Sequence, residues 1–195
     1  MSWMTRTMLA GLAALGLAQS ASAGLLPVSV TITPEAGNFR WTYAIVLPTD
    51  MKLQAGNYFT IYDFNGYKAG GESSPDGWTF SAVKSGPIPD RLKPNDDPAI
   101  INLTWKYNGP TIPSGQIGLG NFWAVSEFGE AKDDFFTART NRTSDGLTDS
   151  NITDTQTPKP TGTPIDPNLV PEPTTLALAG LGLPLVALFR RRNRK

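Results

Sequence analysis

The sequence predicts an all-β protein built as one β-sandwich of about seven to eight strands. Three observations lead to this prediction. Short segments of alternating apolar and polar residues recur between residues 24 and 150. Turns rich in Gly, Pro, Asn and Asp separate these segments. No window repeats apolar residues at i, i+3 and i+4 over more than one turn, as an amphipathic helix requires. A small barrel is the alternative architecture.

The clearest strand is expected over residues 38–47 (NFRWTYAIVL), where Phe39, Trp41, Tyr43 and every second residue after them are apolar. This period of two predicts a long, half-buried strand. The remaining strands are expected over residues 27–33, 58–64, 78–83, 100–107, 116–126 and 134–140. The proline-rich stretch 86–98 lacks periodicity and predicts a long surface loop. Alternating strands and tight turns favour a jelly-roll or immunoglobulin-like general architecture.

The sequence contains neither cysteine nor histidine. Disulfides, thiol nucleophiles, Ser-His-Asp triads and zinc sites built from His or Cys are therefore excluded. The fold must be stabilised by its core alone, and a body of about 130 residues is large enough to bury one. We expect no cofactor.

The formal net charge of zero conceals an acidic body. One basic residue lies in the first 23 residues and five lie after residue 173, whereas all 17 acidic residues lie between residues 24 and 173. Eleven basic residues share that span, so its formal charge is −6. Such a body is not expected to attract nucleic acid.

The N-terminus has the pattern of a secretory signal peptide over residues 1–23. Residues 1–6 carry a basic residue, residues 8–18 form an apolar run, and Ala21-Ser22-Ala23 supplies small residues before a cleavage site. Cleavage is expected between Ala23 and Gly24. An uncleaved membrane anchor is the alternative, although the apolar run is only about 11 residues, whereas a spanning helix needs about 20.

The C-terminus, residues 170–195, has three parts in a fixed order. A rigid turn places Glu172 between two prolines, and an apolar run over residues 176–189 follows. As a helix the run is about 21 Å long, short of a ~30 Å hydrocarbon core unless Thr174, Thr175 and flanking arginines extend it. The positive-inside rule keeps a basic end in the cytoplasm and places the rest of the chain on the other side. The turn is Val170, Pro171, Glu172 and Pro173, and the basic end is Arg190, Arg191, Arg192, Arg194 and Lys195.

This order of V-P-E-P, apolar segment and arginine cluster resembles the PEP-CTERM sorting signal of exported bacterial proteins. The resemblance implies recognition by an exosortase, a membrane-embedded enzyme that removes the tail. It also implies a precursor tethered in the inner membrane and a mature protein at the cell surface, in the outer membrane or in the extracellular matrix of a biofilm. The resemblance implies exopolysaccharide as a further partner. A buried C-terminal helix is the alternative reading of the tail.

Between the body and the tail, the sequence predicts an extended Thr/Pro-rich stalk over residues 151–169. Residues 153–170 hold five threonines and four prolines with few large apolar groups.

The body offers few residues for chemistry. Three acidic pairs, Asp96/Asp97, Asp133/Asp134 and Glu127/Glu130, have the residue type used in glycoside hydrolysis, but their polar surroundings favour solvated turns. Asp145, Asp149 and Asn151 supply oxygen ligands for calcium without the EF-hand pattern, so a plain turn is favoured.

Five aromatic residues are candidates for stacking on sugars, although their alternation with aliphatic residues favours a place in the core. They are Trp41, Tyr58, Trp78, Trp105 and Trp123. The sequence therefore predicts a non-enzymatic exported surface or matrix protein. A carbohydrate-binding module is the alternative, and a polysaccharide hydrolase ranks third.

Overall fold

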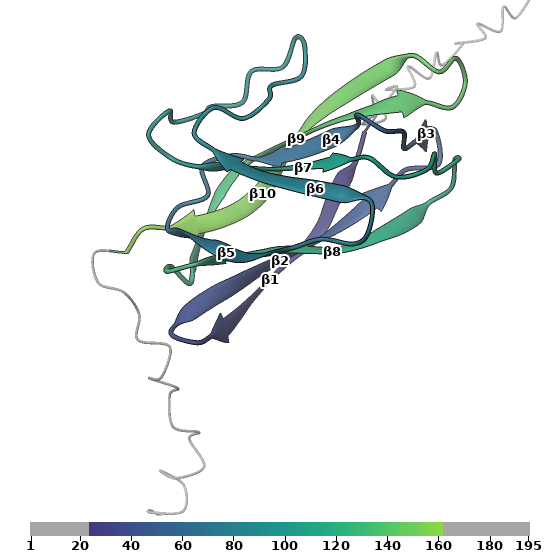
Figure 1. Ribbon diagram of the computed structural model, residues 1–195. Coiled ribbons are helices and arrows are strands. Elements are labelled where there is room, and N and C mark those ends of the chain that lie inside the picture. The colour runs from purple at the N-terminus through teal and green to yellow at the C-terminus, as the bar shows by residue number, and fades with distance from the viewer. Residues whose placement is uncertain (1–23, 162–195) are drawn as a thin grey trace, which may run out of the picture.

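The computed structural model describes residues 24–161, which form strands and no helix. The strands pair into two antiparallel sheets that lie face to face as a sandwich, confirming the predicted fold class (Figure 1). Sheet A has the order β1-β2-β8-β5, and sheet B the order β10-β9-β4-β7-β6, with β3 also paired to β9. The bounds are β1 Leu26–Glu35, β2 Asn38–Leu47, β3 Met51–Lys52, β4 Tyr58–Ile61, β5 Tyr67–Ser73, β6 Trp78–Val83, β7 Asn102–Tyr107, β8 Ile117–Ser126, β9 Glu130–Arg142 and β10 Thr148–Lys159.

The core lies between the sheets and is rich in aromatic residues. Phe59 of β4 is at its centre, stacked on Trp105 and Phe136 of the same sheet with ring centroids 5.2 and 5.4 Å apart. Phe122 of β8 meets Phe59 edge-on at 4.9 Å from the opposite sheet. The alternation of β2 is realised in full, because Trp41 and its apolar neighbours at every second position are buried. Offset and edge-to-face aromatic contacts of this kind stabilise a core beyond the area they bury.

Two hydrogen bonds connect the sheets where β1 and β2 approach β10. The Tyr43 hydroxyl donates to the carbonyl of Gln156 at 2.9 Å. The side-chain amide of Asn151 donates to the carbonyl of Leu25 at 3.0 Å. These bonds satisfy buried polar groups between the sheets.

The predicted stalk is wrong over its first part, because residues 148–159 form strand β10. Each residue of β10 pairs with one of β9, from Thr148 opposite Asn141 to Lys159 opposite Glu130. Thr155 and Thr157 are buried on the core face, and β-branched threonine suits a pleated strand. Pro158 is tolerated because β10 is an edge strand. The folded domain therefore extends beyond residue 150, and residues 162–169 of the predicted stalk lie outside the described residues.

Besides β10, two further strands were not predicted, and residues 24–161 form ten strands rather than seven or eight. Strand β3 is only two residues long. Strand β5 is rich in glycine and mostly exposed, and its pairing with β8 is interrupted between Tyr67 and Glu72. An edge strand with few apolar residues carries no alternating pattern for the sequence to show.

The predicted loop is present, and it covers part of the outer face of sheet B. Residues 84–101, here called the covering loop, connect β6 to β7 without a strand. The carbonyl of Pro87 accepts hydrogen bonds from the hydroxyls of Tyr62 at 3.0 Å and Thr60 at 3.5 Å. Beneath it, Thr60 bonds to Thr104 and Tyr62 to Thr137. A layer of hydroxyls thus holds the loop against the sheet.

Candidate functional site

The predicted sorting signal and the whole predicted leader, residues 1–23, lie outside the described residues. They include Ala21, Ala23, Val170, Pro171, Glu172, Pro173, the apolar run 176–189, Arg190, Arg191, Arg192, Arg194 and Lys195. Gly24, the expected first residue of the processed chain, is the first residue described. Within residues 24–161 there is no helix long and apolar enough to cross a membrane.

The pair Asp133/Asp134 is divided between the two faces of β9. Asp133 is exposed on the outer face. Asp134 is buried on the core side, contrary to the expected solvated turn, and it is paired with Lys132 at 2.6 Å. The hydroxyl of Thr157 donates to the same carboxylate oxygen at 3.3 Å. The two carboxylates therefore point away from each other, as neighbours on a strand do.

Asp96 and Asp97 serve the geometry of the covering loop. Asp96 accepts a hydrogen bond from the Asn102 side chain at 2.8 Å, and Asp97 accepts one from the Ala99 amide at 2.9 Å. The Asp97 amide donates to Asp63, a buried carboxylate that no sequence pattern singles out. Burial raises the pKa of Asp63 above its usual range. Asp63 also has a positive φ of 51°, a conformation that Asp and Asn tolerate better than most residues.

The two members of the third acidic pair, Glu127 and Glu130, have different surroundings. Glu127 makes an exposed ion pair with Lys68 at 2.8 Å, whereas Glu130 is exposed at the start of β9. Exposed ion pairs of this kind contribute at most about 1 kcal/mol to stability.

The three calcium candidates, Asp145, Asp149 and Asn151, each contact protein groups of their own. Asp145 accepts from the Leu147 amide at 2.9 Å and from Arg142 at 2.7 Å. The Leu147 amide, with Arg142 second, lowers the pKa of Asp145. Asp149 lies 3.8 Å from Arg142, and Asn151 is directed at the carbonyl of Leu25. No group of three His, Cys, Asp or Glu residues suited to a metal occurs in the described part of the chain.

The five aromatic candidates do not form one platform. Trp41, Trp78 and Trp105 belong to the core cluster or are packed against it. Trp123 lies on the outer face of sheet A, where the Arg40 guanidinium sits 4.2 Å from its ring centroid. Tyr58 is on the outer face of sheet B, opposite Arg139. The ring of Trp123 is therefore already stacked on a cation.

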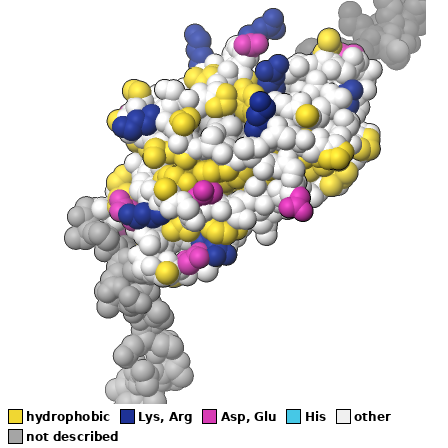
Figure 2. All heavy atoms as spheres, viewed as in Figure 1, with side chains coloured by type: hydrophobic (Ala, Val, Ile, Leu, Met, Phe, Trp, Pro, Cys, Tyr) yellow, Lys and Arg dark blue, Asp and Glu magenta, His cyan; other side chains and the backbone are white. Residues whose placement is uncertain are grey.

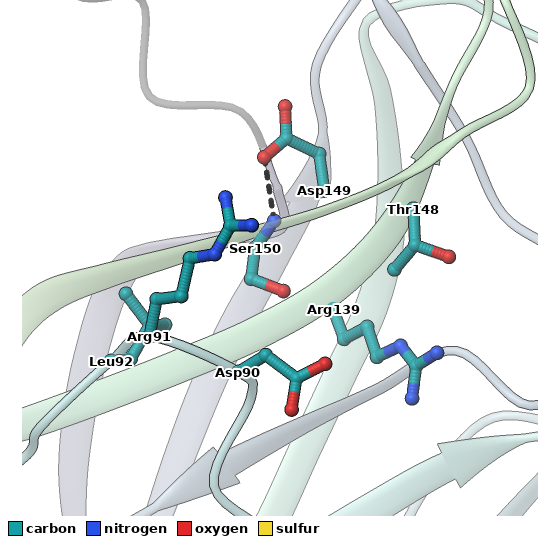
Figure 3. Close-up of a pocket in the computed structure, with 7 residues that line it drawn as sticks. All are labelled: Asp90, Arg91, Leu92, Arg139, Thr148, Asp149 and Ser150. Carbon is teal, nitrogen blue, oxygen red and sulfur yellow. Dashed lines mark hydrogen bonds between the residues drawn. The ribbon is translucent and has the colours of Figure 1, made fainter.

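The structure instead contains a polar pocket of about 380 Å³ on the outer side of sheet B. Its walls come from three segments: the tip of the covering loop, β9 and the start of β10 (Figure 3). Asp90, Arg91, Leu92, Arg139, Thr148, Asp149 and Ser150 line it. Arg139 and Ser150 are opposite each other in the register, so their side chains share the outer face.

Two charged residues of this pocket, Arg139 and Asp90, act on the hydroxyl of Tyr58. Burial raises the pKa of its hydroxyl; the charge of Arg139 lowers that pKa, and the charge of Asp90 raises it. Tyr58 remains a neutral hydroxyl at pH 7, able to donate and accept hydrogen bonds. The pocket therefore offers guanidinium and hydroxyl groups, which recognise anions and polar ligands. No sequence pattern singles out Arg91 and Arg139, because only the register and the covering loop bring them together.

Comparison with known proteins identifies the tail. A family model described as the PEP-CTERM protein-sorting motif matches residues 169–195. The resemblance seen in the sequence is therefore confirmed: the chain carries the sorting motif of an exosortase substrate. Such a motif marks an exported protein that is transiently anchored in the membrane. No curated protein matched the chain.

Proposed function

We propose that the chain is a non-enzymatic protein of the cell surface or extracellular matrix, delivered there through its C-terminal tail. The match over residues 169–195 is the observation that carries the proposal. The leader over residues 1–23 directs export. The tail then holds the precursor in the membrane until an exosortase-like enzyme cuts it, leaving the sandwich domain outside the cell. Anchor signals that are removed after export follow the same logic.

Glu172 is the group on which we propose that recognition depends. Its two proline neighbours fix their own φ and restrict the backbone on either side, so the carboxylate is presented on a stiff segment. A cationic group on the enzyme would bind it through a charge-assisted hydrogen bond, which contributes about 1.5–3 kcal/mol, or roughly 10- to 150-fold in recognition.

Glu172→Gln tests this role, because it keeps the size of the side chain, the apolar run and the basic end. Full-length protein is expected to accumulate in the inner membrane, measured by immunoblot of fractionated cells against a C-terminal epitope. Asp166→Asn is the matched control, since it removes an acid outside the matched segment and should be processed normally. Equal processing of the Glu172→Gln variant and the unmodified protein would contradict the role of Glu172.

The non-enzymatic part of the proposal is supported by the structural contacts of the three acidic pairs, of which Glu127 is in an exposed ion pair with Lys68. Asp133 and Asp134 occupy opposite faces of β9, and Asp96 and Asp97 take part in the hydrogen bonds of the covering loop. Paired carboxylates that hydrolyse glycosides must flank one bond from two sides. We therefore expect no release of reducing ends from polysaccharides of the host. Any such release by the purified protein, abolished by Asp134→Asn, would favour a hydrolase.

A further inference from the structure

Four cations lie around one end of the outer face of sheet B. Lys106 and Arg139 are each opposite Tyr58, on either side of it. Neighbouring strands are about 4.8 Å apart, so the backbones of Lys106 and Arg139 are separated by about 10 Å. Lys52 pairs with Asn141, two positions from Arg139 on β9, and Arg91 shares the pocket with Arg139. We call Lys52, Arg91, Lys106 and Arg139 the cationic strip.

The fold neutralises the strip only in part. None of its four members forms an ion pair with another residue in the range 24–161, whereas Arg40, Lys68, Lys132 and Arg142 all do. Asp90 lies close to the strip, and Asp149, also in the pocket lining, is within 3.8 Å of Arg142. This positive region belongs to an acidic domain, with eleven Lys and Arg against 15 Asp and Glu over the described residues. Figure 2 shows Lys and Arg side chains gathered over the covering loop and sheet B in this view.

The strip is also preorganised. Residues Tyr62 and Thr60 hold the covering loop at Pro87, which places Arg91 beside β9. Arg91 itself has a positive φ of 68°, a backbone conformation that few non-glycine residues adopt. Hydroxyls of Ser150 and Thr148 complete the wall. Groups fixed before a ligand arrives lose less entropy when they bind it.

We propose that the cationic strip binds an acidic polysaccharide, a polymer that carries carboxylate or sulfate groups on hydroxyl-rich rings. Guanidinium groups bind such anions through two parallel hydrogen bonds, and the flanking hydroxyls suit the sugar. Lys106 and Arg139, whose backbones are about 10 Å apart, would each bind one acid group of the same extended chain. This inference goes beyond the proposed sorting function and needs only that the domain is exported.

Other polymers fit the strip less well. The pocket lining includes a single apolar side chain, Leu92. A protein partner would need buried aromatic or aliphatic anchors at the centre of the interface. Single-stranded nucleic acid is normally bound on stacked aromatic residues. Tyr58, the aromatic residue between Lys106 and Arg139, is only 9% exposed. The cations and hydroxyls are the groups that the surface offers.

Affinity electrophoresis tests this proposal. The mobility of the protein recovered from the producing cells is measured in gels that contain polygalacturonate or neutral dextran. Polygalacturonate is expected to retard the protein, less so as salt rises, and dextran is expected to have no effect. The double variant Lys106→Gln/Arg139→Gln should lose at least about ten-fold in affinity. Both side chains are exposed, so a Tm close to that of the unmodified protein checks that the variant folds.

Lys159→Gln is the matched control. It removes one exposed cation at the far end of β10, about 30 Å along the strand from Ser150, and should retain binding within two-fold. Equal losses in the control and in the strip variant would overturn the proposal, as would absence of retardation by polygalacturonate. Tighter binding of polyglutamate or duplex DNA at the same salt would overturn the assignment to polysaccharide. Strip variants should be cut normally at the tail, so failure here and failure of the sorting function are distinguished by C-terminal processing.

Discussion

The two fully buried tryptophans differ in one hydrogen bond, and this difference predicts unequal costs for the same substitution. Trp41 and Trp105 are both 0% exposed. The indole nitrogen of Trp41 donates to the carbonyl of Phe128 at 3.0 Å. The indole nitrogen of Trp105 is buried without an acceptor among the described residues. Replacement by Phe removes the same atoms at each site.

Trp41→Phe should destabilise the domain more than Trp105→Phe. The lost ring volume costs a similar amount at both sites. At position 41 the carbonyl of Phe128 also loses its partner, which costs about 1–3 kcal/mol. At position 105 the substitution removes a buried N–H that has no acceptor. Removing that unsatisfied donor offsets a comparable part of the free-energy cost of the lost ring volume. The two variants should therefore differ by at least about 2 kcal/mol, or about 6 °C in Tm for a domain of this size.

Thermal and guanidinium unfolding, followed by circular dichroism, measures this difference. Equal m-values would show that both variants unfold from the same compact state. Equal destabilisation of the two variants, or a greater loss in Trp105→Phe, would refute the assignment of the hydrogen bond. Trp→Ala at either site should cost about 3–5 kcal/mol, and a loss below about 1 kcal/mol at both would contradict their place in the core.

Two further predictions concern a tight contact and a buried acid. Gly24→Ala should destabilise the processed domain by about 1–3 kcal/mol, because an added Cβ would lie 1.8 Å from the Asn151 side-chain oxygen. Gly118→Ala has open space and is the control, so equal Tm values for the two variants would count against this contact. Burial raises the pKa of Asp63, so ionisation costs stability as pH rises through that pKa. Asp63→Asn keeps an acceptor for the Asp97 amide and should raise Tm at pH 7, with the gain vanishing below the usual aspartate pKa; a lower Tm at pH 7 would contradict it.

The sequence predicted the strands whose apolar residues alternate. Residues 38–47 matched β2 residue for residue, because burial on one face imposes a period of two. Strand β10 was missed because its core-facing positions are Asn151 and threonines rather than large apolar residues. The alternation Thr153, Thr155, Thr157 was visible in the sequence, but the prolines favoured a stalk.

The candidate sites also differ in whether a local sequence pattern reveals them. The tail was recognisable because its information is local: the order of residues is the signal. The cationic strip was not, because Lys106, Tyr58 and Arg139 come from three strands that only the register brings side by side. The covering loop then adds Arg91 through contacts of Pro87 that no local pattern encodes.

The most direct test of the central claim is the intact mass of the protein recovered from outside the inner membrane, with both termini sequenced. The recovered chain is expected to begin at Gly24 and to lack the apolar run 176–189 and the basic end after it. A stable exported protein that still carries Arg190 to Lys195 would contradict removal of the tail, and with it the proposed route to the surface.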